Sequence, residues 1–361
     1  MAKAGSKKGG GPGSSNKTYK SPVEGNGKTG PNSPLRMKIK IDTISITLDV
    51  SHNEKAHIAD RMDEMIQKAQ TLKPKETPTG PITKGSRQLY YKGVVIHPQR
   101  TDGTYAKTGL LIQAEPWYKA NAFLRFQWHP SKLGLAGFER IRKEHMQYVL
   151  HEWQERLISE GTVTRIDMAI DYLGVTPDDF IANVDQMKGR GLYTGADKRR
   201  STESIYFGKT KSSQVCVYDV GRLARLKKET APKGQRTRFE WRYGQGVKAS
   251  ALANLPNHKK LGKLWSRVTV YQPDPTAYPG VRSNYELFQN ACQTRGYSRA
   301  LEMLSDQDRG QVEAYMEAGV APWWKANENW EHWDRALRQA GLSDDLKPLP
   351  PVSGVPKPQS P

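Results

Sequence analysis

The chain has 361 residues, enough for one large domain or two ordinary ones, and 36% of them are hydrophobic, so it can bury a core. Its 56 Lys and Arg residues against 37 Asp and Glu residues give a formal charge of +19, which favours a polyanionic partner such as nucleic acid. The sequence contains no run of about 18 apolar residues, which excludes a transmembrane helix, and its basic start lacks the apolar core of a secretion signal.

The two ends of the chain have the composition of tails. Residues 1–36 are rich in Gly, Ser, Pro, Asn and Lys and predict a disordered basic arm, which either contacts DNA or only keeps the protein in solution. Gly11 to Thr18 superficially resembles a phosphate-binding loop, but Asn16 replaces its second glycine, so an NTPase is rejected. Residues 346–361 are rich in proline and predict a second tail.

Between the tails, alternating hydrophobic residues predict strands. The predicted strands cover residues 39–50, 89–97, 110–113, 122–129, 163–173, 204–208, 214–219 and 236–243. Met146, Val149, Leu150, Trp153 and Leu157 have the spacing of one amphipathic helix, and residues 285–340 look mainly helical. We therefore expect an α+β fold with a mostly antiparallel central sheet flanked by helices.

The strand at 163–173 carries two carboxylates, Asp167 and Asp171, on its polar face, together with Arg165. Glu240 lies on another strand whose polar face is otherwise made of Arg236, Arg238 and Arg242. Carboxylates and arginines facing one another across a sheet can bind Mg²⁺ or Mn²⁺ through oxygen and phosphate through the guanidinium groups. A solvated polar face with Arg165 paired to an aspartate explains the same pattern equally well.

A tyrosine lies within the most basic stretch of the chain. Residues 188–242 contain 15 Lys and Arg against 5 Asp and Glu, and Tyr218 ends a predicted strand inside this stretch. Its expected cationic neighbours are Lys209, Lys211, Arg222, Arg225, Lys227 and Lys228. Neighbouring cations favour attack by a tyrosine oxygen, whose ordinary pKa near 10 makes it a poor nucleophile. A half-buried structural tyrosine is the competing interpretation.

Four short motifs occur in a fixed order: TRIDMAIDYLG at 164–174, SIYFGKTKS at 204–212, VCVYD at 215–219 and RFEWR at 238–242. In this order they resemble the replication initiation factor family, which contains rolling-circle initiators of small plasmids and filamentous phages and some relaxases. The segment RFQWHPSKL at 125–133 also looks like the family's sequence. The resemblance covers about residues 40–245, whereas Val220 departs from the lysine that commonly follows Tyr-Asp.

The resemblance implies the rolling-circle nicking endonuclease fold and a role for each matched residue. Tyr218 would be the catalytic nucleophile, and Asp167 and Glu240, with Asp171, would bind Mg²⁺ or Mn²⁺. The expected DNA-binding residues are Arg165, Lys209, Lys211, Arg222, Arg225, Lys227, Lys228, Arg238 and Arg242. The eight histidines contain no His-x-His pair, so His129 is at most an additional ligand, and Tyr206 is the candidate for a second nucleophile. We expect a nicking domain at 37–245 and a mainly helical region at 246–345 that belongs to it or packs on it.

These expectations describe an enzyme of rolling-circle DNA replication. It would nick one strand at its origin, form a 5′-phosphotyrosyl intermediate and later rejoin the strand, in the cytoplasm of a bacterial host. Its partners would be origin DNA and a host helicase and polymerase, with no membrane involved, and a homodimer is allowed. A conjugative relaxase with the same chemistry and a DNA-binding regulator without catalysis are the alternatives.

Overall fold

The computed structural model describes residues 34–71, 79–81, 89–97, 109–118, 121–187, 190–194, 202–209, 213–280 and 282–342. All of them belong to one compact unit that begins at Ser33. The expected tail at 346–361 lies outside the described residues, as does most of the expected arm at 1–36. The last two residues of that arm, Leu35 and Arg36, form strand β1, so the folded chain starts before residue 37.

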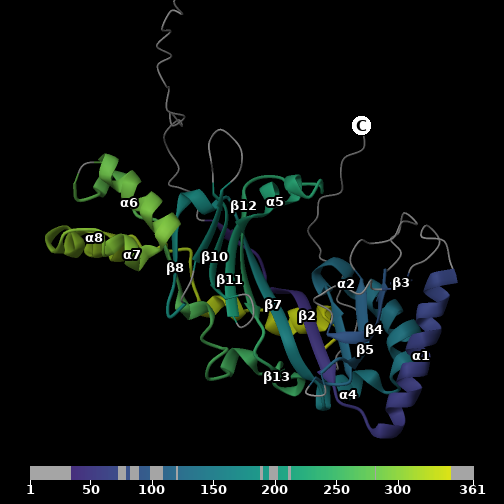
Figure 1. Cartoon of the computed structure of the whole chain (residues 1–361). Helices are drawn as coiled ribbons and strands as arrows, with labels where there is room; N and C mark the ends of the chain where they lie inside the picture. The colour runs from purple at the N-terminus through teal and green to yellow at the C-terminus, as the bar shows by residue number, and fades with distance from the viewer. Residues whose placement is uncertain are drawn as a thin grey trace, which may run out of the picture. The chain divides into compact units, whose positions relative to one another are not determined.

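An antiparallel sheet is the centre of the fold (Figure 1). In spatial order it contains β3 (Thr79–Pro81), β4 (Tyr90–Ile96), β5 (Leu110–Pro116), β6 (Leu124–Trp128), β2 (Lys40–Leu48), β7 (Thr162–Leu173), β12 (Arg236–Tyr243), β11 (Ser213–Asp219), β10 (Thr202–Lys209) and β9 (Arg190–Thr194). Two short strands, β1 (Leu35–Arg36) and β13 (Val247–Lys248), also pair with β7. The expected α+β class with a mostly antiparallel sheet is confirmed.

One face of the sheet is apolar and covered. The hydrophobic side chains of the central strands point to this face, among them Ile46, Phe126, Ile166 and Phe239, and all four are buried. Helices α2 (Pro130–Ile141), α4 (Trp153–Ser159) and α9 (Trp333–Gln339) contact β2, and α1 (His52–Thr71) contacts β3, β4 and β5. The side chains that alternate with the hydrophobic ones therefore form the opposite, polar face.

The C-terminal region contributes to the same core. The ring of Trp324 lies beside Phe239 and Tyr172, with 4.6 Å between the centroids of Phe239 and Trp324. Trp323 also packs on Tyr172, and Trp265 packs on Trp324. A smaller sheet pairs β8 (Ile181–Val184) with β14 (Val268–Tyr271). It packs with the remaining helices, α6 (Arg282–Arg295), α7 (Tyr297–Leu301) and α8 (Asp306–Ala318), around a second hydrophobic cluster. The region after residue 245 thus completes the core instead of forming a separate domain.

The prediction of one continuous amphipathic helix around residues 146–157 is wrong, because the helix is interrupted. A π-helical turn (Arg142–Met146) and the short α3 (Gln147–Val149) end at Leu150, which has an extended backbone. Glu152 then takes a left-handed conformation with φ 53° before α4 begins. Val149, Leu150, Trp153 and Leu157 are nevertheless buried, because the break reorients the chain and keeps its apolar residues on the core.

The remaining described elements are the seven-residue helix α5 (Val220–Leu226) and short 3-10 turns. The turns cover Pro177–Asp179, Ala249–Ala251, Leu255–Asn257, Trp265–Arg267, Pro275–Ala277 and Asn327–Trp330. None of the helices in the described part of the chain combines the length and the apolar character that a membrane span requires.

Replacing Trp324 by alanine tests the shared core. We expect Trp324→Ala to lower the free energy of unfolding by about 3–5 kcal/mol, because it removes a buried indole and its 2.7 Å hydrogen bond to the carbonyl of Val268. Urea unfolding measures this change. The same substitution at Trp117, which is 39% exposed, should cost about 1 kcal/mol or less. Equal costs at the two positions would contradict a core that includes the C-terminal region.

Candidate functional site

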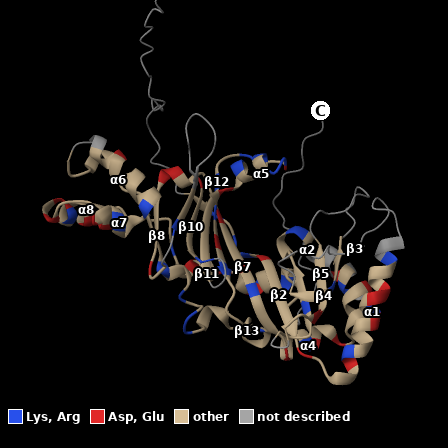
Figure 2. Ribbon diagram, in the orientation of Figure 1, with Lys and Arg blue, Asp and Glu red and all other residues tan. Residues whose placement is uncertain are grey.

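The register of three strands builds a lattice of polar side chains on the polar face. β12 pairs with β7 so that Arg238 lies opposite Asp171 and Arg242 opposite Asp167, while Glu240 lies opposite Ala169. β11 continues the rows, with Tyr218 beside Arg238 and Cys216 beside Glu240. The sheet therefore places all three expected carboxylates and the expected nucleophile on one face, in alternation with arginines. Figure 2 marks the basic residues in blue and the acidic residues in red along the ribbon.

Asp171 is the most strongly paired carboxylate of this lattice. Its side chain is 1% exposed and accepts hydrogen bonds from Lys40 at 2.9 Å, from Arg238 at 2.6 Å and from Arg236. Burial opposes the charge on Asp171, but the hydrogen bond and charge of Arg238 and the charge of Lys40 outweigh it and hold the pKa of this carboxyl below its ordinary value. Asp171 is an anchor for three cations and has no oxygen left for a metal ion.

Tyr218 and Glu240 form a hydrogen-bonded pair in the middle of the lattice. The Tyr218 hydroxyl donates to Glu240 Oε2 at 2.8 Å, and Arg242 Nε donates to Glu240 Oε1 at 2.7 Å. Arg238 Nη1 lies 3.4 Å from the tyrosine oxygen. Burial and then the charge of Glu240 raise the pKa of Tyr218, and Arg238 opposes them. At neutral pH Tyr218 is therefore a protonated hydroxyl whose proton points at a carboxylate.

The expected metal ligands do not assemble into a metal site. Both oxygens of Asp167 accept hydrogen bonds from Arg165, at 2.6–3.1 Å, while those of Glu240 face Arg242 and Tyr218. Among the described residues no group of three or more His, Cys, Asp or Glu side chains has the arrangement that holds a metal ion. The oxygens of Asp167 and Glu240 are already paired with Arg165, Arg242 and Tyr218, and this arrangement does not fit the ion.

The structure adds two members to the site that the sequence did not single out. Lys40 starts β2 and contacts Asp171, and Asp42 accepts a hydrogen bond from Arg238 Nη1 at 2.6 Å. Asp42 stands at an irregularity in the pairing of β2 with β7, between Ile41 and Thr43, which brings its side chain to Arg238. Its Oδ1 is buried without a hydrogen-bond partner in the described structure. The only signal in the sequence was a lone carboxylate inside a strand.

Two residues of the sequence motifs, Gly208 and Asp219, have roles in the local backbone structure. Gly208 has φ +83°, and a Cβ there would lie 2.5 Å from the carbonyl oxygen of Ser213, so a side chain would disrupt the pairing of β10 with β11. Asp219 caps α5, because its side chain accepts a hydrogen bond from the backbone N–H of Arg222 at 3.0 Å. The Tyr-Asp pair therefore joins the strand of Tyr218 to a basic helix.

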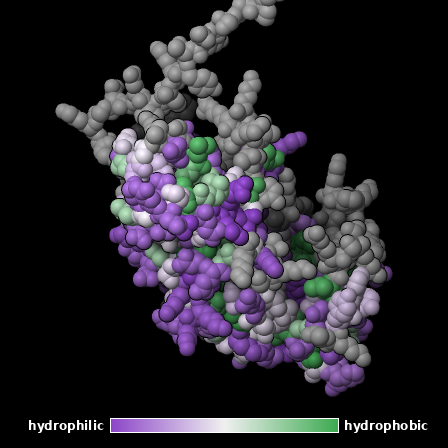
Figure 3. Space-filling model, turned by 60° about the vertical axis from the view of Figure 1, so that its left-hand side comes forward, coloured by the Kyte–Doolittle hydropathy of each residue, from purple (hydrophilic) through white to green (hydrophobic). Residues whose placement is uncertain are grey.

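The remaining expected DNA-binding residues lie around α5 or at the end of β10. Arg225, Lys227, Lys228 and Lys209 are exposed, whereas the Arg222 side chain is largely buried, 3.8 Å from Glu203. Lys211 lies outside the described residues. Hydrophilic residues cover most of the described surface in Figure 3, interrupted by small hydrophobic patches.

The two supplementary candidates lie on opposite sides of the lattice. His129 follows β6, and its Nδ1 lies 3.0 Å from the hydroxyl of Thr43, which is opposite Asp167 in the sheet. Burial, and then the charge of Lys132, lowers the pKa of His129, so the ring is neutral at pH 7. Tyr206 lies on β10 beside Cys216. Neither residue completes a metal-binding group of described side chains.

Comparison with known proteins gives no assignment: no protein-family model matches the chain, and no curated protein matches it.

Replacing Asp171 by asparagine tests its anchoring role. We expect Asp171→Asn to lower the free energy of unfolding at pH 7 by about 3 kcal/mol, because it leaves three partly buried cations without their shared carboxylate. The pKa of Asp171 is lowered in the folded state, so its contribution is present above the unfolded value of about 4 and is lost as the pH falls through the folded pKa. Urea unfolding from pH 7 to pH 2 should show the wild type and the variant converging below pH 4. A constant difference across this range would refute the ion-pair origin.

Proposed function

We propose that the protein is a DNA strand-nicking and rejoining enzyme of rolling-circle replication, with Tyr218 as its nucleophile. The observation that carries the proposal is the arrangement of Tyr218, Glu240 and Arg242, in which a nucleophile contacts a base and the base is oriented by a third group. The order of the four sequence motifs supports the same reaction and a relation to the rolling-circle nicking endonuclease fold. The net charge of +19 supports a nucleic acid substrate.

The proposed reaction follows from the hydrogen bonds of the site. The Tyr218 oxygen attacks the phosphorus of a DNA phosphodiester while its proton passes to Glu240 Oε2. The bond from phosphorus to the 3′ oxygen breaks, and water supplies the proton that turns the leaving oxygen into a 3′-hydroxyl. The 5′-phosphotyrosyl link keeps the energy of the broken bond, so attack by a 3′-hydroxyl rejoins the strand and returns the proton to Tyr218.

The raised pKa of Tyr218 makes Glu240 necessary in this scheme. A tyrosine that stays protonated at neutral pH can attack only if its proton leaves in the same step. Arg238, 3.4 Å from the tyrosine oxygen, is placed to neutralise charge on the phosphate once DNA is bound. No step is derived through a divalent ion, although the family resemblance implies Mg²⁺ or Mn²⁺. The reaction is therefore assayed both with these ions and with EDTA.

A DNA-binding regulator without catalysis is the second candidate. The observation that favours it is the burial of Tyr218, whose side chain is 6% exposed and covered in part by Arg238. Nicking requires that bound DNA displaces this cover, whereas a regulator needs no such movement. A conjugative relaxase would share the nicking chemistry, and origin replication assays separate it from a replication initiator.

The Tyr218→Phe variant tests the nucleophile. Wild-type protein incubated with labelled single-stranded origin oligonucleotides, with Mg²⁺, Mn²⁺ or EDTA, should give a covalent protein-DNA adduct on a denaturing gel. Tyr218→Phe should give no adduct yet bind the oligonucleotide as tightly, because it removes only the hydroxyl. Tyr206→Phe is the matched control and should keep the adduct. Loss of the adduct in Tyr206→Phe but not in Tyr218→Phe would show that Tyr206 is the nucleophile. Binding of the oligonucleotide by wild type without any cleavage would support the regulator.

The Glu240→Gln variant tests the base. It keeps the size of the side chain but removes the charge that takes the proton, so we expect nicking to slow by about 10²–10⁴-fold. Quenched single-turnover reactions measure this rate. DNA affinity should not fall, because removing a carboxylate from the face makes the face more positive. A rate within a factor of two of wild type would exclude Glu240 as the base.

A further inference from the structure

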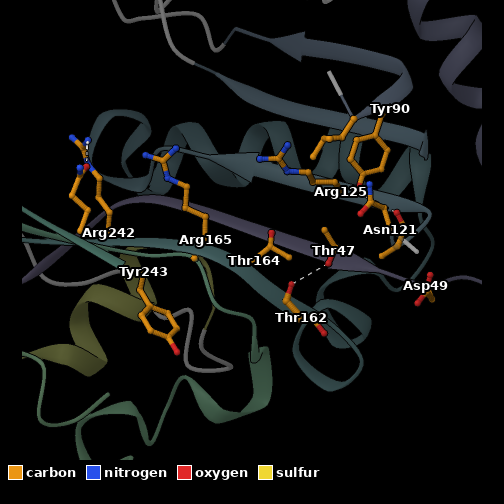
Figure 4. Close-up of a pocket in the computed structure, with 14 residues that line it drawn as sticks. Thr47, Asp49, Tyr90, Asn121, Arg125, Thr162, Thr164, Arg165, Arg242 and Tyr243 are labelled. Carbon is orange, nitrogen blue, oxygen red and sulfur yellow. Dashed lines mark hydrogen bonds between the residues drawn. The ribbon is translucent and has the colours of Figure 1, made fainter. Parts of the chain in front are cut away.

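A hollow on the polar face lies away from Tyr218 and contains a row of arginines. Its volume is about 720 Å³, and its lining includes Arg125 of β6, Arg165 of β7 and Arg242 of β12. Figure 4 shows the three guanidinium groups extending to the same side of the sheet, with Thr164 between Arg165 and Arg125. We call this feature the arginine hollow. On β11 the residue opposite Arg242 is Gln214, which also lines the hollow. Gln214 lies four residues from Tyr218, or about 13 Å along the strand.

Arg125 is a partly buried cation held by uncharged side chains. Its three nitrogen donors are held by neutral oxygens: Nε by Ser45 at 2.8 Å, Nη1 by Gln113 at 3.0 Å and Nη2 by Gln127 at 2.6 Å. In the described part of the chain no carboxylate forms an ion pair with it, and burial lowers its pKa. Asp49 also lines the hollow, but its carboxylate accepts a hydrogen bond from the backbone of Phe123. A fixed guanidinium that carries a desolvation cost and has no charged partner among the described residues is suited to receive an anion.

The two other arginines keep capacity for the same anion. Arg165 binds Asp167 through Nε and Nη2, and within the described structure its Nη1 makes no hydrogen bond. Its side chain is 45% exposed, and that of Arg242 is 32% exposed. Three cations spaced across neighbouring strands suit the repeated phosphates of a nucleic acid backbone better than one small anion.

An exposed aromatic pair lies next to the arginine hollow. Tyr91 is 57% exposed and Trp117 is 39% exposed, and their ring centroids are 5.6 Å apart. Tyr91 directly follows Leu89 and Tyr90, which line the hollow, and the backbone of Trp117 bonds to the carbonyl of Leu89 at 2.9 Å. Large aromatic side chains left in solvent beside a basic groove are the usual elements of single-strand binding, in which bases stack on the rings.

We propose that the arginine hollow and the pair Tyr91 and Trp117 form a track for single-stranded DNA that leads to the nicking site and meets it at Arg242. The phosphates bind Arg125, Arg165 and Arg242, and bases stack on Tyr91 and Trp117. A duplex does not fit this role, because its bases are already stacked on one another. The track deepens the proposed function, on which it rests for DNA as the substrate. It holds the strand beside the site while Tyr218 reacts.

Two kinds of variant test the track by different signatures. Fluorescence anisotropy measures the affinity for a labelled mixed-sequence oligonucleotide between about 50 and 200 mM salt, in a Tyr218→Phe background that prevents cleavage. Arg125→Gln should weaken binding about tenfold and reduce the steepness of log affinity against log salt by about 0.7, because one phosphate contact is lost. Trp117→Ala and Tyr91→Ala should weaken binding about fivefold or more and leave the salt slope unchanged.

Matched controls separate the track from general effects. Arg299→Met removes the same charge from an exposed arginine on α7 and should change neither affinity nor slope by more than the experimental error. Arg125→Lys retains the charge, so the salt dependence of the affinity should stay the same. The affinity itself should fall in part, because lysine lacks the planar guanidinium group that can bind a phosphate with two hydrogen bonds. Thermal unfolding checks that every variant is folded. If Arg125→Gln does not fold, Trp117→Ala and Tyr91→Ala still decide the outcome.

Three results would overturn the proposal. The first is unchanged affinity and slope in both the arginine and the aromatic variants. The second is duplex binding as tight as single-strand binding and insensitive to Trp117→Ala. The third is displacement of the oligonucleotide by an equal concentration of a mononucleotide, which would make the arginine hollow a site for a single phosphate. Loss of binding in these variants while wild type never nicks would uphold the track and refute the nuclease.

Discussion

The register between β7 and β12 is the constraint on which the rest of the structure depends. It places Asp171 against Arg238 and Asp167 against Arg242, with Glu240 between these rows. The same register turns Phe239 and Tyr172 to the opposite face, where they meet the tryptophans of the C-terminal region. Because side chains alternate with a period of two, a slip by one residue would bury the charges and expose the aromatic rings. Core packing and site geometry are therefore set by one choice of pairing.

The charges of the face are balanced locally around Tyr218 and unbalanced farther away. Near the tyrosine, each described carboxylate contacts at least one arginine or lysine, so little net charge remains to attract DNA. At Arg125 the guanidinium contacts only neutral oxygens, and at α5 the basic side chains are exposed. Electrostatic attraction would thus act on the strand at both flanks of the nicking site. The paired centre would keep its arginines oriented for the phosphate, which reduces the reorganisation needed in the reaction.

The sequence predicted the parts of the fold that depend on one strand at a time. The strand at 163–173 and the strand at 236–243 are nearly as expected, because their alternation is strict and one face is buried. The break at Leu150 was missed, since Val149, Leu150, Trp153 and Leu157 have helical spacing and a local pattern cannot show that the chain changes direction. The role of Trp323 and Trp324 was missed as well, because Trp323 packs on Phe180 and Trp324 on Phe239, each more than 80 residues away in the chain.

The candidate site could be predicted in its residues but not in its contacts. Asp167, Glu240 and Tyr218 were expected to belong to one site, and the register places them on one face of the sheet. Which oxygen faces which cation depends on side-chain lengths and on a bulge in β2, and the bulge brings Asp42 to Arg238. No single-strand pattern contains this information. Arg125 was overlooked for a related reason. It stands out because no described carboxylate forms an ion pair with it, and this can be recognised only when all the neighbouring strands are in place.

The hydrogen bond between Tyr218 and Glu240 assigns different roles to both residues than the sequence motifs did. If Glu240 were a metal ligand, the charge of the ion would favour ionisation of a nearby tyrosine, and no base would be needed. In the arrangement found here, burial and the charge of Glu240 raise the pKa of Tyr218, and the same carboxylate is the acceptor for its proton. In the proposed reaction, the residue that holds Tyr218 protonated would thus also be the one that takes its proton. Such a pair would restrain the tyrosine until a phosphate comes within reach, which would protect DNA that is bound without being correctly positioned.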